Sequence, residues 1–297
     1  MPASSAESDR PPVVAGQFYP DDPDTCLREA RQMLQSAPDH DSASPYLGAL
    51  LPHAGWICSG QVAANGIAAL RRSHPKPNVI VIFGAVHTLS INHAALDDHA
   101  RWLLPSGTSD IATALVERLA SASDDISVDS RAHRYEHAIE VLLPMVQQAW
   151  PHTPILPIEG PPTPNAADIG RQVATALQET NQQALFIASS DLTHYGPSYH
   201  LTSAGAGQRG IAWAMDNDRR LLDLIQALQA GQIVPETLRH SNACGGGAIA
   251  AMLGASIALG ATKSTLLEHT NSYEVLSRAL GRQSADNSVG YAAALIG

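Results

Sequence analysis

The chain has 297 residues, of which 44% are hydrophobic and 15% charged, and its formal net charge is −10. This length is enough for a large core in one α/β unit, no apolar run reaches the roughly 20 residues of a membrane span, and a weakly charged acidic surface disfavours nucleic acid and anionic membranes as partners. Three cysteines are a small and odd number, which does not fit a disulfide framework. We therefore expect a reducing, cytoplasmic location.

The expected elements alternate between apolar strands and helices after a polar, disordered lead-in at residues 1–9, which lacks the apolar core of a secretory signal. In chain order we expect a helical acidic segment at 21–34, a strand at 46–52, a helix at 59–72, a strand at 78–84, helices at 110–121 and 136–150, a strand at 154–158, a helix at 166–179, a strand at 184–189, helices at 207–230 and 246–259, and strands at 262–270 and 289–296. The first four strands are nearly continuous apolar runs, which suit a sheet covered on both faces. The alternation predicts one α/β domain, residues 10–297, with a central mostly parallel or mixed sheet flanked by helices.

Polar side chains that can bind a metal ion or transfer a proton follow three of the expected strands directly. His53, His87 and the pair Asp191 and His194 each come just after the end of a different strand. In an open α/β sheet, ligands bind in the crevice beyond the carboxyl ends of the strands. We therefore expect these side chains to meet at one rim of the sheet.

The first two histidines lie in similar turns, within the segments PHAGW and GAVHT. A glycine beside each histidine lets the chain turn tightly there. Histidines at two strand ends, His53 and His87, make a platform of two nitrogens for a metal ion. Each histidine taken alone is explained as well by a hydrogen bond to the backbone of a helix-entry turn.

Two further segments, SSDLTHYG and EHAIE, contribute acid–base groups. His194 suits a general acid or base, and Asp191, three residues earlier, would orient it or bind a substrate group. Asp191 is explained nearly as well as the cap of a short turn. His137 and Glu140 have the spacing of a shared helix face, which is typical both of metal sites and of solvated pairs, so we assign His137 to the pocket or to the support of the ligands.

Cys244 lies in the segment NACGGG, just before the expected helix at 246–259. A cysteine at a helix N-terminus has a lowered pKa, so its thiolate is available as a nucleophile or a metal ligand. The competing explanation is a small buried cysteine in a tight turn. Cys26, in the acidic helical segment, and Cys58, at the start of the helix after His53, are expected to have secondary roles.

These segments, in this order, resemble the motifs of the MEMO family, whose bacterial members are called AmmeMemoRadiSam system protein B. The opening RPPVVAGQFYP resembles that family's N-terminal signature, and PHAGW, EHAIEVLLP, SSDLTHYG and CGGGAI resemble its later motifs. The resemblance runs from about Arg10 to Ile296. In fold, the family resembles the class III extradiol dioxygenases of the LigB type, which bind ferrous iron through two histidines and a glutamate.

The resemblance implies a metal site in which a cysteine takes the place of the dioxygenase glutamate. It makes His53, His87 and Cys244 the ligands of one metal ion, with Fe(II) favoured and copper or zinc as alternatives. It places His194 at the position of the dioxygenases' acid–base histidine, with Asp191 beside it. The matching motifs also supply four expected substrate-binding residues: Phe18, Trp56, His137 and Tyr195.

Two departures from the family pattern alter the expected pocket wall. Ala85 and Val86 stand where many members have Pro followed by Ser or Asn, and Cys58 stands where many have an aromatic residue. Both departures spare the ligands and leave the substrate specificity open.

The resemblance implies a metal-dependent, dioxygenase-like oxidoreductase that acts with O₂ on an unidentified small substrate. An adaptor or carrier that holds a peptide or only the metal is the main alternative, because MEMO proteins from animals are described in these terms. A hydrolase that uses a metal-activated water is the third. The name of the bacterial members implies a functional link to AMMECR-type and radical-SAM proteins.

Overall fold

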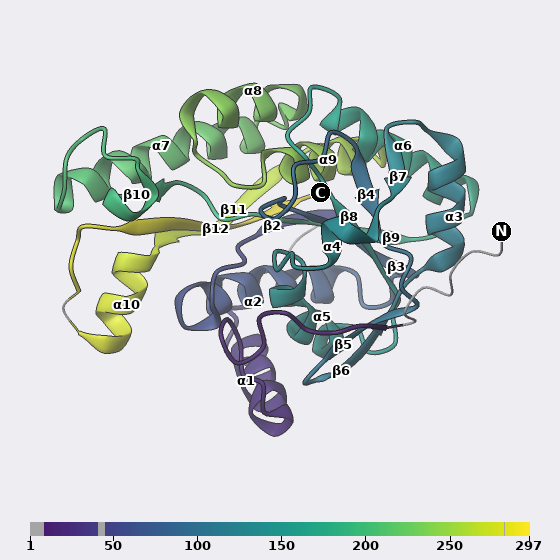
Figure 1. The fold of residues 1–297 in the computed structure, drawn as a ribbon, viewed down its shortest axis with the longest axis horizontal. Coiled ribbons are helices and arrows are strands. Elements are labelled where there is room, and N and C mark those ends of the chain that lie inside the picture. Colours follow the sequence, from purple (N-terminus) through teal and green to yellow (C-terminus); the bar gives the residue numbers. More distant parts are fainter. Residues whose placement is uncertain (1–8, 41–44, 282) are drawn as a thin grey trace.

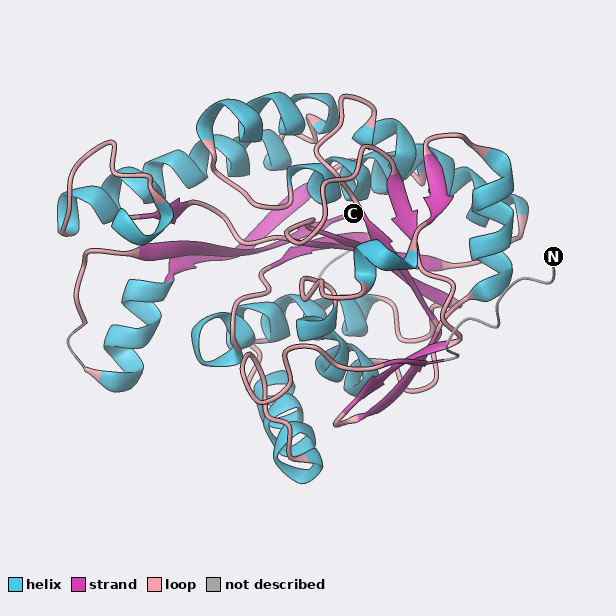
Figure 2. Cartoon of the chain, in the orientation of Figure 1, coloured by secondary structure: helices cyan, strands magenta, loops and turns pink. Residues whose placement is uncertain are grey.

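The computed structural model describes residues 9–40, 45–281 and 283–297. A mixed sheet lies between two layers of helices (Figures 1 and 2), which confirms the expected α/β fold. Most of the expected lead-in lies outside the described residues, whereas Asp9 begins strand β1 (Asp9–Arg10). No helix in the described residues is long and apolar enough to span a membrane.

Among the described residues the central sheet has nine strands, and its middle is parallel. Its order is β10 (His194–Tyr195), β12 (Ser288–Ile296), β2 (Gly48–Leu51), β9 (Ala184–Ser189), β3 (Val79–Gly84), β8 (Ile155–Glu159), β4 (Ala94–Leu96) and β7 (Ile126–Val128), with β11 (Ser264–Asn271) also paired to β12. Strands β2, β9, β3 and β8 run parallel, whereas β12 and β4 run antiparallel to their neighbours β2 and β8. Every residue of the four parallel strands is buried, which accounts for their continuous apolar sequences.

Helices cover both faces of this sheet (Figure 1). One face carries α1 (Pro23–Gln35), α2 (Trp56–Ser73), α5 (Leu143–Ala149) and α10 (Ser272–Leu280), and the other carries α3 (Thr113–Ala122), α6 (Ala166–Glu179), α7 (Gln208–Gln226), α8 (Ala230–His240) and α9 (Gly246–Ala258). Helix α9 contacts β2, β3 and β9 on one side and α6 and α8 on the other, so it is apolar all round. A Cβ at Gly170 of α6 would collide with the carbonyl oxygen of Ala251, so small residues bring α6 and α9 into backbone contact.

A second, small sheet anchors the N-terminal segment beside the 133–140 turn. Its order is β1, β5 (Arg101–Leu104) and β6 (Gly107–Asp110). Arg10 of β1 is buried, with its guanidinium 3.8 Å from the ring centre of Trp102 and its Nη1 donating to Oε2 of Glu140 at 2.8 Å. Its Nε and Nη2 donate to the carbonyl oxygens of His133 at 2.9 Å and Glu136 at 2.6 Å. Arg10 therefore fixes the backbone of the turn that carries Glu136 and His137.

The helix expected at 136–150 is much shorter than predicted. Residues Glu136 to Ile139 form an irregular turn, Glu140–Leu142 a single 3₁₀ turn, and the α-helix begins only at Leu143. Pro144 explains this start, because proline lacks an amide hydrogen and is tolerated only in the first turn of a helix. His137 and Glu140 consequently do not share a helix face, which corrects that expectation.

Two other helices have boundaries that differ from the prediction. The helix expected at 110–121 begins at Thr113, because Asp110 ends β6. The helix expected at 207–230 ends at Gln226 as α7, because Leu228 has a φ of 54°. A further helix, α8, begins at Ala230 and was not expected. Single left-handed residues of this kind end helices.

Candidate metal centre

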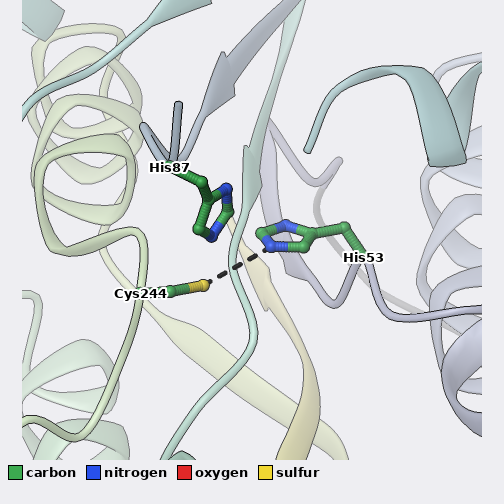
Figure 3. A group of neighbouring side chains, drawn as sticks. All are labelled: His53, His87 and Cys244. Atoms are coloured by element: carbon green, nitrogen blue, oxygen red, sulfur yellow. Dashed lines mark hydrogen bonds between the residues drawn. The ribbon is translucent and has the colours of Figure 1, made fainter. Parts of the chain in front are cut away.

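The proposed ligands meet beyond the carboxyl ends of three adjacent strands, as expected. Strands β2, β9 and β3 lie side by side and parallel, so His53 after β2 and His87 after β3 emerge at one edge on either side of β9. Cys244 approaches the same point from the loop before α9 (Figure 3). The rule that places ligands at the ends of parallel strands therefore located this cluster correctly.

His53, His87 and Cys244 form a compact group of donor atoms. One donor atom from each lies within 4.8 Å of the others. Sγ of Cys244 is 3.4 Å from Nε2 of His53, and the rings of His53 and His87 are 5.2 Å apart and nearly perpendicular. Figure 3 shows the thiol and both imidazoles turned toward one another.

His53 is held in a single orientation by β9 and the loop that follows it. Its Nδ1 lies 2.9 Å from Oγ of Ser189, and that hydroxyl donates its own proton to the carbonyl oxygen of Ala138 at 2.6 Å. Ser189 therefore accepts from Nδ1–H, which leaves the lone pair of the neutral ring on Nε2, facing Cys244. Burial, and then the nearby imidazoles of His87 and His137, lower the pKa of His53 well below its usual range, so the ring is neutral.

Glu136 orients the second imidazole. Its carboxylate accepts from the backbone N–H of His87 at 2.6 Å and lies 2.8 Å from Nδ1 of the same residue. Because a carboxylate only accepts, Nδ1 of His87 carries a proton and Nε2 faces the cluster. Burial opposes its charge, but hydrogen bonds from His137 and His87 hold the pKa of Glu136 well below its usual range. Burial likewise opposes the charged form of His87, but its contacts with Cys244 and Glu136 raise the pKa of His87 to about 10.

His137 lies beside the cluster, as the assignment to the pocket requires. Its ring stacks on that of His87 at 4.8 Å and lies edge-on to that of His53 at 5.4 Å. Nδ1 of His137 is 3.2 Å from Oε1 of Glu136, so one carboxylate supports both imidazoles. His87, Glu136 and His137 also form a second close group of donor atoms, but the Glu136 oxygens are already used by these hydrogen bonds.

The Cys244 loop is tied to the loop after β9. The backbone N–H of Cys244 donates to the carbonyl oxygen of Asp191 at 3.3 Å, and that of Gly245 donates to Oγ of Ser190 at 2.8 Å. Gly247, in the first turn of α9, has no room for a side chain, because a Cβ there would collide with the carbonyl oxygen of Pro161. The glycines therefore allow α9 to start close enough for Cys244 to reach His53.

Asp191 supports His53 rather than His194. Its Oδ1 accepts from the backbone N–H groups of His53 at 2.8 Å and Ala54 at 3.3 Å, so it caps the turn after β2. Within the described residues, no hydrogen bond joins its carboxylate to the ring of His194. Burial raises the pKa of Asp191, although the neighbouring His194 opposes this shift. Asp191 therefore caps a turn, as the alternative explanation proposed, but the turn is the one after β2 and not the one that contains Asp191.

His194 is the acid–base candidate that remains available. Its Nδ1 lies 3.1 Å from the carbonyl oxygen of Leu192, which only accepts, so Nδ1 carries the proton and Nε2 the lone pair when the ring is neutral. The ring packs edge-on against that of Tyr199 at 5.1 Å. This tautomer suits the removal of a proton from a bound group.

The other expected substrate-binding residues lie in different surroundings. Phe18 packs edge-on against His137 at 4.9 Å, at the border of the cluster. Trp56 is buried and its indole N–H donates to the carbonyl oxygen of Val141 at 3.0 Å. The hydroxyl of Tyr195 donates to the carbonyl oxygen of Gly205 at 2.7 Å. Both side chains therefore have a hydrogen-bond partner within the protein, and their assignment to substrate binding stays a prediction.

A cavity of about 320 Å³ opens beside the exposed part of His87. Its wall is formed by residues 86–91 and by Pro161 and Pro162, so it includes Val86, where the sequence departs from the family pattern. Its wall mixes the apolar side chains of Leu89 and Ile91 with the hydroxyls of Thr88 and Ser90.

The comparison with known proteins agrees with these motifs. The model of the Memo-like protein family matches residues 10–295. The chain belongs to the Memo family. It is 35% identical over 293 residues to a MEMO1 family protein of Methanosarcina barkeri, covering 97% of this chain and 99% of that protein. It is 34% identical over 277 residues to one of Methanothermobacter thermautotrophicus, covering 90% and 94%.

A solved structure of an uncharacterized protein from Escherichia coli K12 has a similar fold. The two superimpose with a TM-score of 0.53 at 14% sequence identity, covering 84% of this chain and 99% of the other. At this identity the likeness concerns the fold of the Memo family chain and not its chemistry.

Sequence reasoning missed several residues that build this centre. Glu136 opens the motif EHAIE, in which the sequence pattern points only to His137 and Glu140. Ser189 ends β9 and supports His53, and Arg10 fixes the turn that carries Glu136. The one available signal was position, because both Ser189 and Glu136 stand in segments already singled out for other residues.

Proposed function

We propose that this Memo family protein is a metal-dependent, dioxygenase-like oxidoreductase whose ion is bound by His53, His87 and Cys244. The observation that carries the proposal is the matched state of the two imidazoles. Ser189 and Glu136 each accept from Nδ1–H, so both rings turn Nε2 toward the thiol. His53 offers a lone pair there, and His87 does so once it releases its second proton. Protein metal sites are supported in this way, because the partner of the far nitrogen fixes the tautomer and the ring orientation.

The donor set fits a first-row transition metal. The 3.4 Å between Sγ of Cys244 and Nε2 of His53 is the spacing expected when each atom lies about 2.0–2.3 Å from one shared ion. Two imidazoles and a soft thiolate suit Fe(II), copper or zinc better than magnesium or calcium, which prefer oxygen ligands. We favour Fe(II), because open coordination positions at a non-haem Fe(II) centre bind O₂, as in the extradiol dioxygenases that the family resembles in fold, whereas a set of two histidines and one cysteine makes copper the main alternative.

The bound metal and the residues around the ligands would each have a separate role in the reaction. A bound iron would supply Lewis acidity and electron transfer at coordination positions that the three ligands leave open. His194, with its lone pair on Nε2, would take a proton from a substrate hydroxyl and later return it. His137 and Phe18 border the cluster and would orient the substrate.

Anaerobic purification followed by elemental analysis tests the proposal. We expect about one iron ion per chain, an electronic spectrum that changes when Cys244 is replaced by serine, and O₂ consumption with a small hydroxylated aromatic compound. Metal without turnover would instead favour a carrier or adaptor, and zinc with a titrating water would favour a hydrolase. Failure of the reconstituted wild-type protein to retain any transition metal would refute the proposed site.

A further inference from the structure

Helix α7 buries two adjacent polar residues, Asn217 and Asp218, which are 4% and 0% exposed. Oδ1 of Asp218 accepts from the backbone N–H of Thr193 at 2.8 Å, and its Oδ2 lies 3.0 Å from Nε2 of His269 on β11. A Cβ at Gly290 would collide with this carboxylate, so glycine at that position of β12 makes room for it. Asp218 thus fixes the residue that immediately precedes His194.

Asn217 extends the same attachment to the loop that carries Cys244. Its Nδ2 donates to Oγ1 of Thr193 at 3.1 Å and to the carbonyl oxygen of His240 at 3.0 Å. The backbone carbonyl oxygen of Asn217 accepts from Nδ2 of Asn242 at 3.0 Å, and Asn242 lies two residues before Cys244. The loops before His194 and before Cys244 are therefore bound to one turn of α7.

The burial of these groups makes the attachment specific. Thr193 and Asn242, like Asp218, are completely inaccessible to solvent. A buried polar group that loses its partner cannot turn to water instead, so the alternatives to this arrangement are unfavourable. The loops also touch directly, through an antiparallel bridge between Leu192 and Ala243.

We propose that Asn217 and Asp218 are positioning residues that hold the His194 loop and the Cys244 loop at a fixed distance from each other. A substitution at Thr193 should therefore change the accessibility of Cys244. Thr193 does not belong to the proposed ligand set, and its contacts with α7 provide the connection. A catalytic role for this coupling rests on the proposed function, which assigns metal binding to Cys244 and proton transfer to His194. The coupling itself is a property of the polypeptide and is measurable in the metal-free protein.

The test compares Thr193→Val, which removes the hydroxyl at nearly constant volume, with Thr193→Ser, which keeps it. Alkylation of Cys244 by iodoacetamide is followed in the metal-free protein by peptide mass spectrometry. We expect the valine variant to react roughly fivefold faster or more, because losing one buried hydrogen bond raises the population of locally open states by about that factor. The serine variant should react at nearly the wild-type rate.

A control separates this effect from general loss of stability. Leu119→Ala, in the buried face of α3, destabilises the core far from the network and should leave the alkylation rate of Cys244 unchanged. Equal acceleration in Leu119→Ala and Thr193→Val would overturn the proposal, as would an unchanged rate in Thr193→Val.

The reciprocal variant covers the case in which Thr193→Val does not fold. Asn242→Ala breaks the link from the Cys244 side, and we expect faster amide hydrogen exchange in residues 190–195, which a purely local role for Asn242 would not produce. Unchanged exchange there would also overturn the proposal. Metal content of the wild-type protein is measured in parallel, because its absence would refute the proposed function while the coupling in the metal-free protein would stand.

Discussion

Nε2 of His53 lies 3.4 Å from Sγ of Cys244, although 191 positions separate the two residues in the chain. If this contact marks a shared ion, then His53→Ala, His87→Ala and Cys244→Ser should each lower metal affinity by more than the roughly 10–100-fold that loss of a supporting partner costs. Elemental analysis and competition with a chelator measure the loss, and circular dichroism checks that the fold survives.

Cys26→Ala provides the matched control for the cysteine variant. Cys26 is buried in α1 and is not one of the three grouped donor residues. The metal content of the Cys26→Ala protein should therefore equal that of the wild-type protein. Full occupancy in all three ligand variants would disprove the assignment, and loss of metal in Cys26→Ala would mean that the ligand set is wrong.

Glu136→Gln should weaken metal binding without removing a ligand. The carboxylate accepts from both the backbone and Nδ1 of His87, and glutamine replaces one of its two accepting oxygens with a donor. We expect affinity to fall by about 10–100-fold, the range for loss of such a partner. An affinity equal to that of the wild-type protein would show that His87 does not depend on Glu136.

His194→Phe should affect turnover more than metal content. His194 lies outside the proposed ligand set, and its free Nε2 suits proton transfer, which contributes about 10²–10⁴-fold in rate. The variant is assayed for bound metal and for O₂-dependent activity. Retained metal with lost turnover fits the proposal, whereas lost metal would make His194 a ligand and unchanged turnover would remove it from the mechanism.

Arg10→Met should destabilise the fold, because it leaves the buried Glu140 carboxylate without its ionic partner, although the hydrogen bonds from Val13, Val14 and Tyr19 remain. Both side chains are almost completely buried, and they form an ion pair of 2.8 Å. Removing one partner of such a pair costs about 3–5 kcal/mol. Urea unfolding measures the change, and the double variant Arg10→Met with Glu140→Gln should recover part of it. A double variant no more stable than Arg10→Met alone would contradict this explanation.

Metal affinity should rise with pH through the neutral range. In the metal-free protein, contacts with Cys244 and Glu136 raise the pKa of His87 to about 10 despite burial, so below that pH a proton occupies the ring that must bind the ion. Each proton released on binding increases the apparent affinity by about tenfold per pH unit. Isothermal titration in buffers of different ionisation enthalpy counts these protons, and an affinity independent of pH below this value would contradict the assignment.

The sequence predicted the site better than it predicted the segments that support the site. His53 and His87 were placed together because strand ends are recognisable from apolar runs, and parallel strands end at one edge. The order of the strands was not accessible in this way, because the insertion of β9 between β2 and β3 depends on pairing between segments far apart in the chain.

The supporting residues were missed for a different physical reason. Arginine and aspartate are mostly exposed in proteins, so Arg10 and Asp218 gave no sign of their burial until their partners were known. The apolar pattern of residues 136–150 predicts a helix that includes Glu136, but Pro144 restricts the α-helix to residues from Leu143 onward. Polar networks of this kind are defined by tertiary contacts, which local sequence patterns do not encode.

The position of β9 between β2 and β3 has a consequence for the order of events during biosynthesis. The strands that carry His53 and His87 make no hydrogen bonds to each other, since both pair with β9, which follows much later in the chain. A nascent chain that has emerged only through β3 therefore holds both histidines without the scaffold that sets their spacing, and the thiol of Cys244 emerges later still. Contacts between such distant segments form slowly and late in folding. All three proposed ligands can therefore meet only after the chain has emerged beyond Cys244.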